Sequence, residues 1–325
     1  MSTVSHGPAA SPVSANDPGY QALRSAAAWL DLSGRGKIIA TGEDRARLLH
    51  AMTTNQVQEL KPGEGCYAFF LNAQGRILGD VNLFCRENDF LLDVEPETCE
   101  SLYQHLDHYI IADDVTLEDA TPRIGTLSIE GPQALAAVAR TGAPVPDKPW
   151  AHAAWNNITV ANVSSTGAPA LRFFVPTDEK QALIEKFTIP EASPEAARVV
   201  RLENLQPRYG EDILGTTLSQ ETRQSHAVNF NKGCYIGQEI VERVRSRGLV
   251  HRLLAGVEID SSKPPEPDTR LFQGDQDVGK MMSSAFSPAL GKVVGLAYLR
   301  RELAEPGTAL TVNGHAAVIR ALHRP

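Results

Sequence analysis

The same order of predicted secondary structure occurs twice in this chain. A strand at residues 37–41 leads through a glycine turn into a helix, and antiparallel strands and a second helix at 97–109 follow. The order begins again with a strand at 124–129 and ends with a helix at 178–187. We therefore predict an α+β fold with two related lobes, each built on an antiparallel sheet. The alternative is a chance likeness, because no residue pattern repeats strictly between the two parts.

The composition changes after Gly248, where short strands are predicted around residues 253–259, 293–299, 310–312 and 316–321. Proline and glycine turns separate these strands, a spacing typical of a small β-barrel. A chain of 325 residues is also too long for one ordinary core. We predict a disordered tail at residues 1–19, a first lobe at 20–123, a second lobe at 124–247 and the barrel at 248–325.

Charge and cysteine content argue against several classes of protein. A net charge of −8 gives no overall basic field for nucleic acid or anionic membrane, and no apolar run approaches the length of a membrane span. The four cysteines show no C-x-x-C and no spacing typical of a zinc or iron–sulfur site, so no resident metal is expected. Residues 1–19 lack the apolar core and basic start of a signal peptide. We expect a cytoplasmic protein and a monomer.

Residues 231–239 read NKGCYIGQE and place Cys234 between two glycines, directly before a predicted helix. Apolar residues at helical spacing follow, and Gly248 ends the run. The positive end of a helix dipole and the neighbouring Lys232 would both favour the thiolate, which is the reactive form of cysteine. The alternative is that Cys234 is a small apolar residue packed in the interior.

Residues 232–239 resemble the K-G-C-Y-x-G-Q-E signature of the YgfZ proteins, which are folate-binding relatives of the glycine-cleavage T-protein (GcvT, aminomethyltransferase). Residues 71–77, 201–203 and 207–210 are similar to further blocks of that family, so the resemblance covers most of the chain. It implies a GcvT-like ring of three domains around a central hole that holds tetrahydrofolate or a related folate.

The resemblance also implies which side chains hold the folate. A pterin needs a carboxylate to accept its paired N–H donors and an aromatic or apolar slot for its plane. The pterin-binding glutamate of the T-proteins matches Glu203, and Tyr67, Tyr209 and Asn72 are implied as further cofactor-binding residues. The alternative is that Glu203 is an ordinary glutamate on a helix surface and that the tyrosines belong to the core.

Asp80 is implied as both a catalytic and a folate-binding residue. The T-proteins activate folate with an aspartate in a Gly-Gly-x-x-Asp-Asp segment, and the matching stretch here, residues 75–80, keeps only Asp80. Gly79 stands where the first aspartate would be, and this departure argues against aminomethyl transfer. The alternative is that Asp80 simply ends an exposed strand.

The function implied by the resemblance is that of a tetrahydrofolate-binding protein that supports the assembly or repair of iron–sulfur enzymes, including those that modify tRNA. Cys234 would be the essential catalytic group, with Lys232 setting its charge environment. A single cysteine cannot complete a cluster, so contacts with iron–sulfur enzymes or cluster-assembly proteins would be transient. Two alternatives remain: a true aminomethyltransferase, and a folate-binding scaffold without catalysis. The resemblance leaves open whether the protein is an enzyme.

Overall fold

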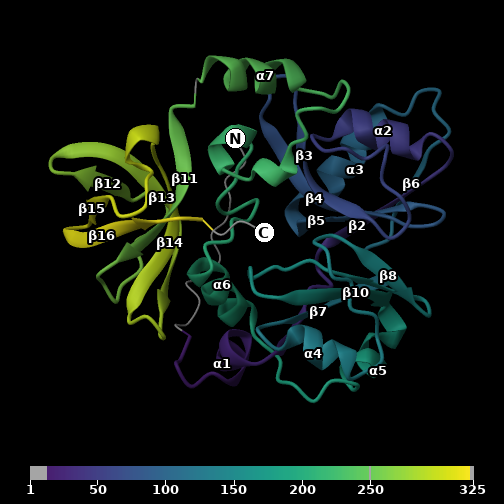
Figure 1. The fold of residues 1–325 in the computed structure, drawn as a ribbon, viewed down its shortest axis with the longest axis horizontal. Coiled ribbons are helices and arrows are strands. Elements are labelled where there is room, and N and C mark those ends of the chain that lie inside the picture. Colours follow the sequence, from purple (N-terminus) through teal and green to yellow (C-terminus); the bar gives the residue numbers. More distant parts are fainter. Residues whose placement is uncertain (1–12, 249, 323–325) are drawn as a thin grey trace.

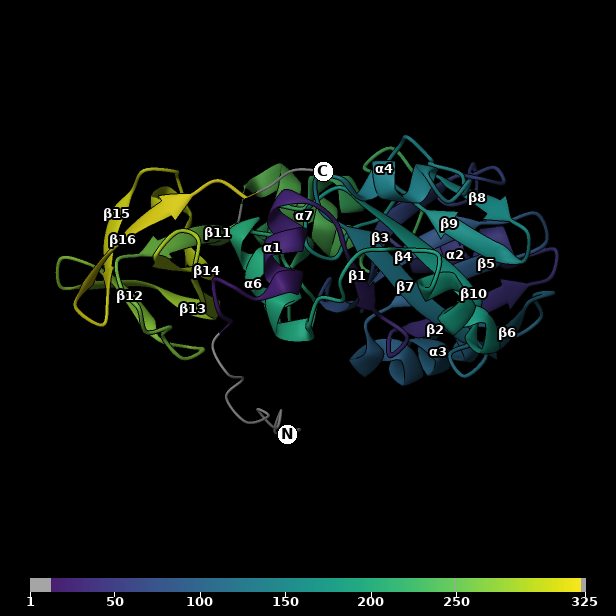
Figure 2. The same cartoon turned by 90° about the horizontal axis from the view of Figure 1, so that it is seen from below.

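The computed structural model describes residues 13–248 and 250–322, which form three domains. Two five-stranded sheets and a closed barrel lie around a central region (Figure 1). The barrel forms one end of the molecule, and helices α1 (Pro18–Ser25), α6 (Pro194–Glu203) and α7 (Gln238–Arg247) lie between it and the sheets (Figure 2). The predicted α+β class, with two antiparallel sheets and a C-terminal β-barrel, is confirmed. No helix in the described part of the chain is long and apolar enough to cross a membrane.

The first sheet has the strand order β3-β4-β5-β2-β6. Cys66, Ala68 and Phe70 alternate along its edge strand and pack in the cluster formed with the helices on its outer face. Tyr67 and Phe69 therefore point to the inner face, because successive side chains of a strand point to opposite sides. The strands and helices of this lobe are β2 (Gly36–Thr41), α2 (Arg45–Met52), β3 (Gly65–Leu71), β4 (Ile77–Cys85), β5 (Phe90–Val94), α3 (Cys99–His108) and β6 (Thr116–Asp119).

The second sheet has the order β1-β7-β10-β9-β8, with α4 and α5 in its outer layer. Its elements are β1 (Ala28–Asp31), β7 (Ile124–Glu130), α4 (Ala134–Ala139), β8 (His152–Trp155), β9 (Ile158–Ala161), β10 (Ala170–Pro176) and α5 (Lys180–Ile184).

The N-terminal part of the chain departs from the predicted domain boundaries. β1 pairs antiparallel with β7, with Ala28 opposite Glu130, so this strand belongs to the second sheet although it falls within the residues predicted for the first lobe. α1 begins inside the predicted tail, because the Asp17 carboxylate accepts a hydrogen bond from the Tyr20 amide and Pro18 stands in the first turn. Residues 1–12 of that tail lie outside the described residues.

The inner faces of the two sheets pack against each other. Phe84 and Leu91 of the first sheet join Phe174 of the second in one apolar cluster, where the two phenylalanine rings lie 5.5 Å apart. The strands that meet there are buried on both faces. On β4, Asp80 and Asn82 share a face with Phe84, so the apolar contact gives way to polar side chains along this strand. The candidate site lies at this polar end.

The barrel closes in the order β11-β14-β13-β12-β15-β16. Leu254 and Leu296 on its outer side pack with Leu23 and Val199 of α1 and α6. α7 leads toward the barrel and is followed by Gly248, which has φ = 62° and ends the helix as the sequence predicts. The barrel strands are β11 (Arg252–Ile259), β12 (Arg270–Gln273), β13 (Gln276–Ser287), β14 (Lys292–Arg300), β15 (Ala309–Val312) and β16 (His315–Arg320).

Candidate functional site

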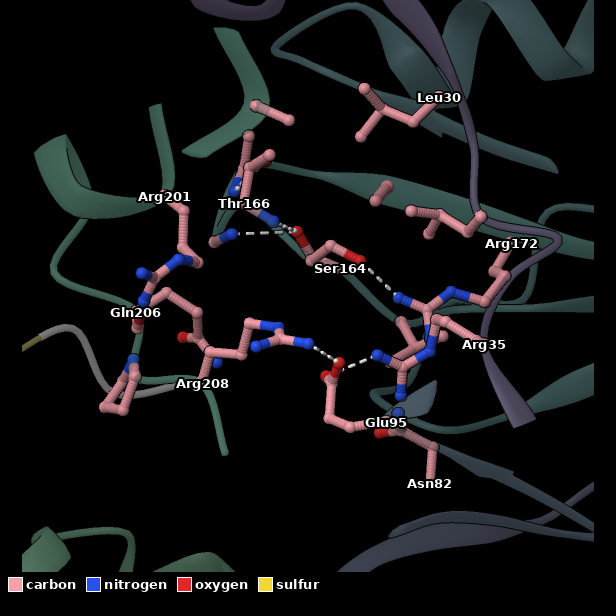
Figure 3. Close-up of a pocket in the computed structure, with 18 of the residues that line it drawn as sticks. Leu30, Arg35, Asn82, Glu95, Ser164, Thr166, Arg172, Arg201, Gln206 and Arg208 are labelled. Carbon is pink, nitrogen blue, oxygen red and sulfur yellow. Dashed lines mark hydrogen bonds and ion pairs between the residues drawn. The ribbon is translucent and has the colours of Figure 1, made fainter. Parts of the chain in front are cut away.

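A cavity of about 730 Å³ is lined by residues of both sheets, of α6 and of the loop that follows α6 (Figure 3). A volume of this size is typical of small-molecule sites. Its lining includes Leu30, Arg35, Tyr67, Asp80, Asn82, Glu95, Trp150, Ser165, Arg172, Arg201, Arg208, Gln224 and His226. The structure thus brings together two of the predicted site residues, Tyr67 and Asp80.

Asp80 and Tyr67 come from adjacent strands. Phe69 lies opposite Asp80 in the β3–β4 ladder, which makes Tyr67 a diagonal neighbour of Asp80 on the same inner face. The Tyr67 hydroxyl donates a hydrogen bond of 2.8 Å to Asp80 Oδ2. Asp80 Oδ1 is buried and has no hydrogen-bond partner among the described residues. An unpaired carboxyl oxygen beside a cavity is costly without a ligand or water, so this atom marks the polar centre of the site.

The environment of Asp80 favours its neutral form. Burial raises the pKa of Asp80 to about 7, and repulsion by the Glu95 carboxylate acts in the same direction. Burial also raises the pKa of Tyr67 well above its usual range, and the charge of the nearby Asp80 raises it further. A carboxyl group with a pKa close to neutral can both donate and accept a proton at physiological pH, as general acid–base chemistry requires.

Three aromatic rings form a wall beside Asp80. The Trp150 ring lies 6.2 Å from Tyr67 and 5.4 Å from His226, tilted by 28° and 24°. Trp150 has a left-handed backbone with φ = 60°, a conformation that is unfavourable for a bulky residue, and its indole N–H donates to Asn82 Oδ1 at 2.9 Å. Burial lowers the pKa of His226 to about 4, so its imidazole is neutral at physiological pH. We name Tyr67, Trp150 and His226 the aromatic wall.

Buried ion pairs connect the two lobes next to the wall. Asp93 of β5 accepts hydrogen bonds from Arg35 at 2.7 Å and from Arg172 of β10. Burial acts to raise the pKa of Asp93, but the two guanidinium groups outweigh it and lower that pKa. Glu95 lies between Arg35 and Arg208, with a distance of 2.8 Å to Arg208 (Figure 3). These pairs fix the position of β5 and β10 where they border the cavity.

Glu203 lies outside the cavity lining. Its Oε1 accepts hydrogen bonds from the Tyr20 hydroxyl at 2.5 Å and the Ser287 hydroxyl at 2.6 Å, and its Oε2 lies 2.9 Å from Arg24. The carboxylate therefore links α1, the end of α6 and the barrel. The prediction that Glu203 binds a pterin stays a prediction, and the structure shows both of its oxygens already in use.

Two other predicted cofactor residues are also outside the lining. Asn72 Oδ1 accepts hydrogen bonds from the backbone amides of Gln74 and Arg76, both at 3.0 Å, and so shapes the β3–β4 turn. Tyr209 packs in the cluster around Ile77 and Ile213, and burial raises its pKa to about 12. For both residues a folate contact remains untested.

The cysteine motif lies at the surface. Cys234 is exposed and is not part of the cavity lining, whereas Cys66 and Cys85 are buried. Gly237 has φ = 83°, and a Cβ there would lie 2.7 Å from the Asn72 carbonyl oxygen, so glycine lets the β3–β4 turn approach the motif. No group of three or more His, Cys, Asp or Glu side chains that could hold a metal ion occurs in residues 13–248 and 250–322.

Lys232 is buried beneath the motif and is directed toward α2. Its ammonium donates hydrogen bonds to the carbonyl oxygens of His50 and, at 2.6 Å, of Thr53. Burial lowers the pKa of Lys232 to about 8. These contacts anchor the motif, and the predicted influence of Lys232 on the Cys234 thiol remains untested.

Comparison with protein families gives matches to both parts of the chain. The GCVT N-terminal domain matches residues 13–232, and the glycine cleavage T-protein C-terminal barrel domain matches residues 252–322. The chain belongs to the glycine cleavage T-protein family. All the residues that line the cavity fall within the first matched range, so the cavity belongs to the part shared with the T-protein family.

Relatives within the T-protein family are similar over most of their length. An aminomethyltransferase of Chlorobium chlorochromatii (strain CaD3) is 28% identical over 93% of this chain and 88% of its own length. A putative chloroplastic transferase of Arabidopsis thaliana is 26% identical over 92% of this chain and 71% of its own. The aminomethyltransferase T structure from Bartonella henselae has a TM-score of 0.85 at 21% identity, covering 94% of this chain and 88% of that one, which supports the fold.

Cys234 lies in the interval between the two T-protein matches, as does all of α7. The family matches therefore do not account for the exposed cysteine, and assignment to the YgfZ proteins stays a prediction.

Sequence reasoning missed Trp150, His226 and Gln224 altogether. The sequence did contain a signal for polar site residues on the first sheet, because Asn82 and Asp93 interrupt strands that are otherwise apolar. No comparable signal marks the three missed residues, which reach the cavity from loops and a short 3-10 helix.

Proposed function

We propose that the cavity binds tetrahydrofolate or a related folate. The observation that carries this proposal is Asp80 Oδ1, which has no hydrogen-bond partner in the described part of the chain and is buried beside an aromatic wall in a cavity of about 730 Å³. A planar ring with polar edges fits such a surface, because the wall covers its face and the carboxyl group satisfies donors at its edge. The residues present thus fit the cofactor that the resemblance to the T-proteins implies.

The roles of the lining residues follow from their contacts. Asp80 would hydrogen-bond the folate and hold or release a proton, since its pKa lies near neutrality. Tyr67 would orient Asp80 through their 2.8 Å hydrogen bond. Trp150 and His226 would pack against the ring face, with Trp150 held by Asn82. When bound, tetrahydrofolate would supply a nucleophilic nitrogen that carries one-carbon groups.

Calorimetry combined with tryptophan fluorescence tests this proposal. The chain has three tryptophans, and Trp29→Phe with Trp155→Phe would leave Trp150 as the only emitting indole. Tetrahydrofolate should release heat on binding and quench Trp150. Asp80→Leu should abolish the heat, while Asp147→Leu at an exposed position should not. Absence of heat at high ligand excess, or heat without quenching, would remove folate from the cavity.

We propose further that the protein acts in the manner of the YgfZ proteins, supporting assembly or repair of iron–sulfur enzymes, including those that modify tRNA. The motif at residues 232–239 and the surface exposure of Cys234 support this proposal. An exposed thiol is available to a protein partner, whereas a thiol inside the cavity would serve a small molecule. In this proposal the partners bind transiently, and the protein is a cytoplasmic monomer.

Iron–sulfur enzyme activities in a strain that lacks this protein test the second proposal. Those activities, including tRNA modification, should fall and should be restored by the wild-type chain. If the Cys234→Ser variant also restored these activities, the thiol would have no role in supporting iron–sulfur enzymes. Normal activities in the deletion strain would remove the iron–sulfur function.

Aminomethyl transfer is an alternative to the iron–sulfur function, and one observation favours it. Gly79 faces α3, where a Cβ would lie 2.8 Å from Leu102 Cδ1, so the position that lacks an aspartate is on the side of β4 away from the cavity. The carboxylate that lines the cavity, Asp80, is retained. Turnover with an aminomethylated lipoyl carrier and tetrahydrofolate would establish this activity. Folate binding with neither turnover nor an iron–sulfur phenotype would favour the non-catalytic scaffold.

A further inference from the structure

Gln224 is a buried polar residue of the cavity lining, and none of the roles proposed above involves it. It lies between two short 3-10 helices, at residues Ser219–Thr222 and Ser225–Ala227, and its side chain is buried. Its amide nitrogen Nε2 has no hydrogen-bond partner among the described residues. An amide N–H that is buried without a partner is costly, and one that borders a cavity points to a bound acceptor.

Gln224 borders the same cavity as Asp80 and lies beside Tyr67. Its side chain lies close enough to the Tyr67 hydroxyl to oppose the rise in the pKa of that tyrosine, and the same hydroxyl donates to Asp80. Gln224, Tyr67 and Asp80 therefore form one continuous polar edge of the cavity. His226, two residues further along, belongs to the aromatic wall.

The backbone that carries Gln224 is held firmly against the first lobe. Asn55 Nδ2 donates to the carbonyl oxygens of His226 and Tyr67, both at 2.8 Å, and the Thr54 hydroxyl donates to the Ala227 carbonyl at 2.6 Å. The backbone amide of Gln224 donates to the Thr222 hydroxyl at 3.2 Å. A donor fixed in this way can discriminate between ligands, because little conformational entropy is lost when a hydrogen bond forms.

We propose that Gln224 determines ring specificity by donating a hydrogen bond from its amide to the carbonyl oxygen of a bound pyrimidinone ring. The inference rests on the proposed folate function and names the edge of the folate that the site recognises. Asp80 supplies the neighbouring carboxyl group, and the aromatic wall covers the face of the ring. A ring with an amino group in place of the carbonyl would present a donor to a donor and would be rejected.

The test compares tetrahydrofolate with its 4-amino-4-deoxy analogue by calorimetry. The wild-type protein should bind tetrahydrofolate at least about tenfold more tightly, the effect expected when a buried donor is left unpaired. Gln224→Met, which keeps the length of the side chain and removes the donor, should reduce this preference by about tenfold. Gln224→Glu, which replaces the donor by an acceptor, should shift the preference toward the amino analogue.

A matched control separates this inference from the proposed function. Gln273 is an exposed glutamine of the barrel outside the cavity lining, and Gln273→Met should leave the preference unchanged. If neither compound binds to the wild-type protein, the folate proposal fails, and this inference fails with it. If both bind and the preference is the same in Gln224→Met and Gln224→Glu as in the wild type, the inference alone is overturned. Thermal melting of each variant confirms that it is folded.

Discussion

The ammonium group of Lys232 donates a hydrogen bond of 2.6 Å to the backbone carbonyl oxygen of Thr53, the residue that follows α2. The same group donates to the carbonyl oxygen of His50 in the last turn of that helix. Unpaired carbonyls and the negative end of the helix dipole meet there, so a buried cation is favourable at this position. The lysine before the exposed cysteine therefore joins the motif to the first lobe.

Lys232→Met should destabilise the protein by about 2 kcal/mol, because it leaves two carbonyl oxygens without their donor. It should also increase hydrogen exchange at residues 231–237, since the anchor of this segment is lost. Denaturant unfolding and hydrogen exchange measure the two effects. Lys263→Met, at an exposed lysine of the barrel, is the control and should change neither. Unchanged exchange in Lys232→Met would show that the lysine is not an anchor.

The second prediction concerns the pH dependence of stability. Burial raises the pKa of Asp80 to about 7, above its usual value of 3.8. Between about pH 4 and pH 7 the folded protein therefore keeps a proton that the unfolded chain has lost, and Asp80 reduces stability as the pH rises through this window. Asp80→Asn removes this contribution, so the variant should become more stable than the wild type as the pH increases.

The size of the Asp80 effect has an upper limit set by linkage. One proton changes the free energy of unfolding by at most about 1.4 kcal/mol per pH unit, which allows a gain on the order of 4 kcal/mol at pH 8. Urea unfolding of both proteins from pH 4 to pH 8 measures the difference, and Asp147→Asn at an exposed position is the control. A difference that does not grow with pH would place the pKa of Asp80 near its ordinary value.

The elements that could be predicted from the sequence are those set by local patterns. Alternation along β3 and β4 places Tyr67 and Asp80 on one face, and helical spacing with a terminal glycine defines α7. The site needs more than these patterns, because Trp150 and His226 reach Tyr67 from segments far away in the sequence. Only the packing of the two sheets brings such segments together, and no local propensity encodes it.

Glu203 illustrates the same limit for a residue predicted by resemblance. The end of α6 places its carboxylate against α1 and the barrel, where Tyr20 and Ser287 are its donors. Tyr20 comes from a segment that the sequence pattern assigns partly to a tail. Since this contact joins residues 183 positions apart in the chain, it could not be foreseen from the helix itself.

Glu203→Ala should lower the free energy of unfolding by about 2 kcal/mol, because two hydroxyl groups lose their acceptor and Arg24 loses its partner. Affinity for tetrahydrofolate, in contrast, should stay within about twofold of the wild-type value, since Glu203 is not part of the cavity lining. Denaturant unfolding and calorimetry measure the two quantities. Loss of affinity without loss of stability would show instead that Glu203 binds the folate, as the family resemblance implies.

The last prediction concerns Cys234, whose thiol is exposed. Burial raises the pKa of Cys66 to about 12 and raises the pKa values of Cys85 and Cys99, so these thiols are poor nucleophiles near neutral pH. Alkylation of the folded protein should therefore modify Cys234 faster than any other cysteine, by roughly tenfold or more. Mass spectrometry of peptides after brief treatment with iodoacetamide measures the order of modification.

Cys234→Ser then separates chemistry from structure. Because the side chain is exposed, the substitution should change the free energy of unfolding by no more than about 0.5 kcal/mol and should leave folate affinity unchanged. Support of iron–sulfur enzymes should nevertheless be lost, since serine has no soft thiolate to offer a cluster or a partner. Cys99→Ser is the control and should retain that support. Equal support by both variants would show that the exposed thiol is not needed, and a large loss of stability in Cys234→Ser would show that the residue is structural.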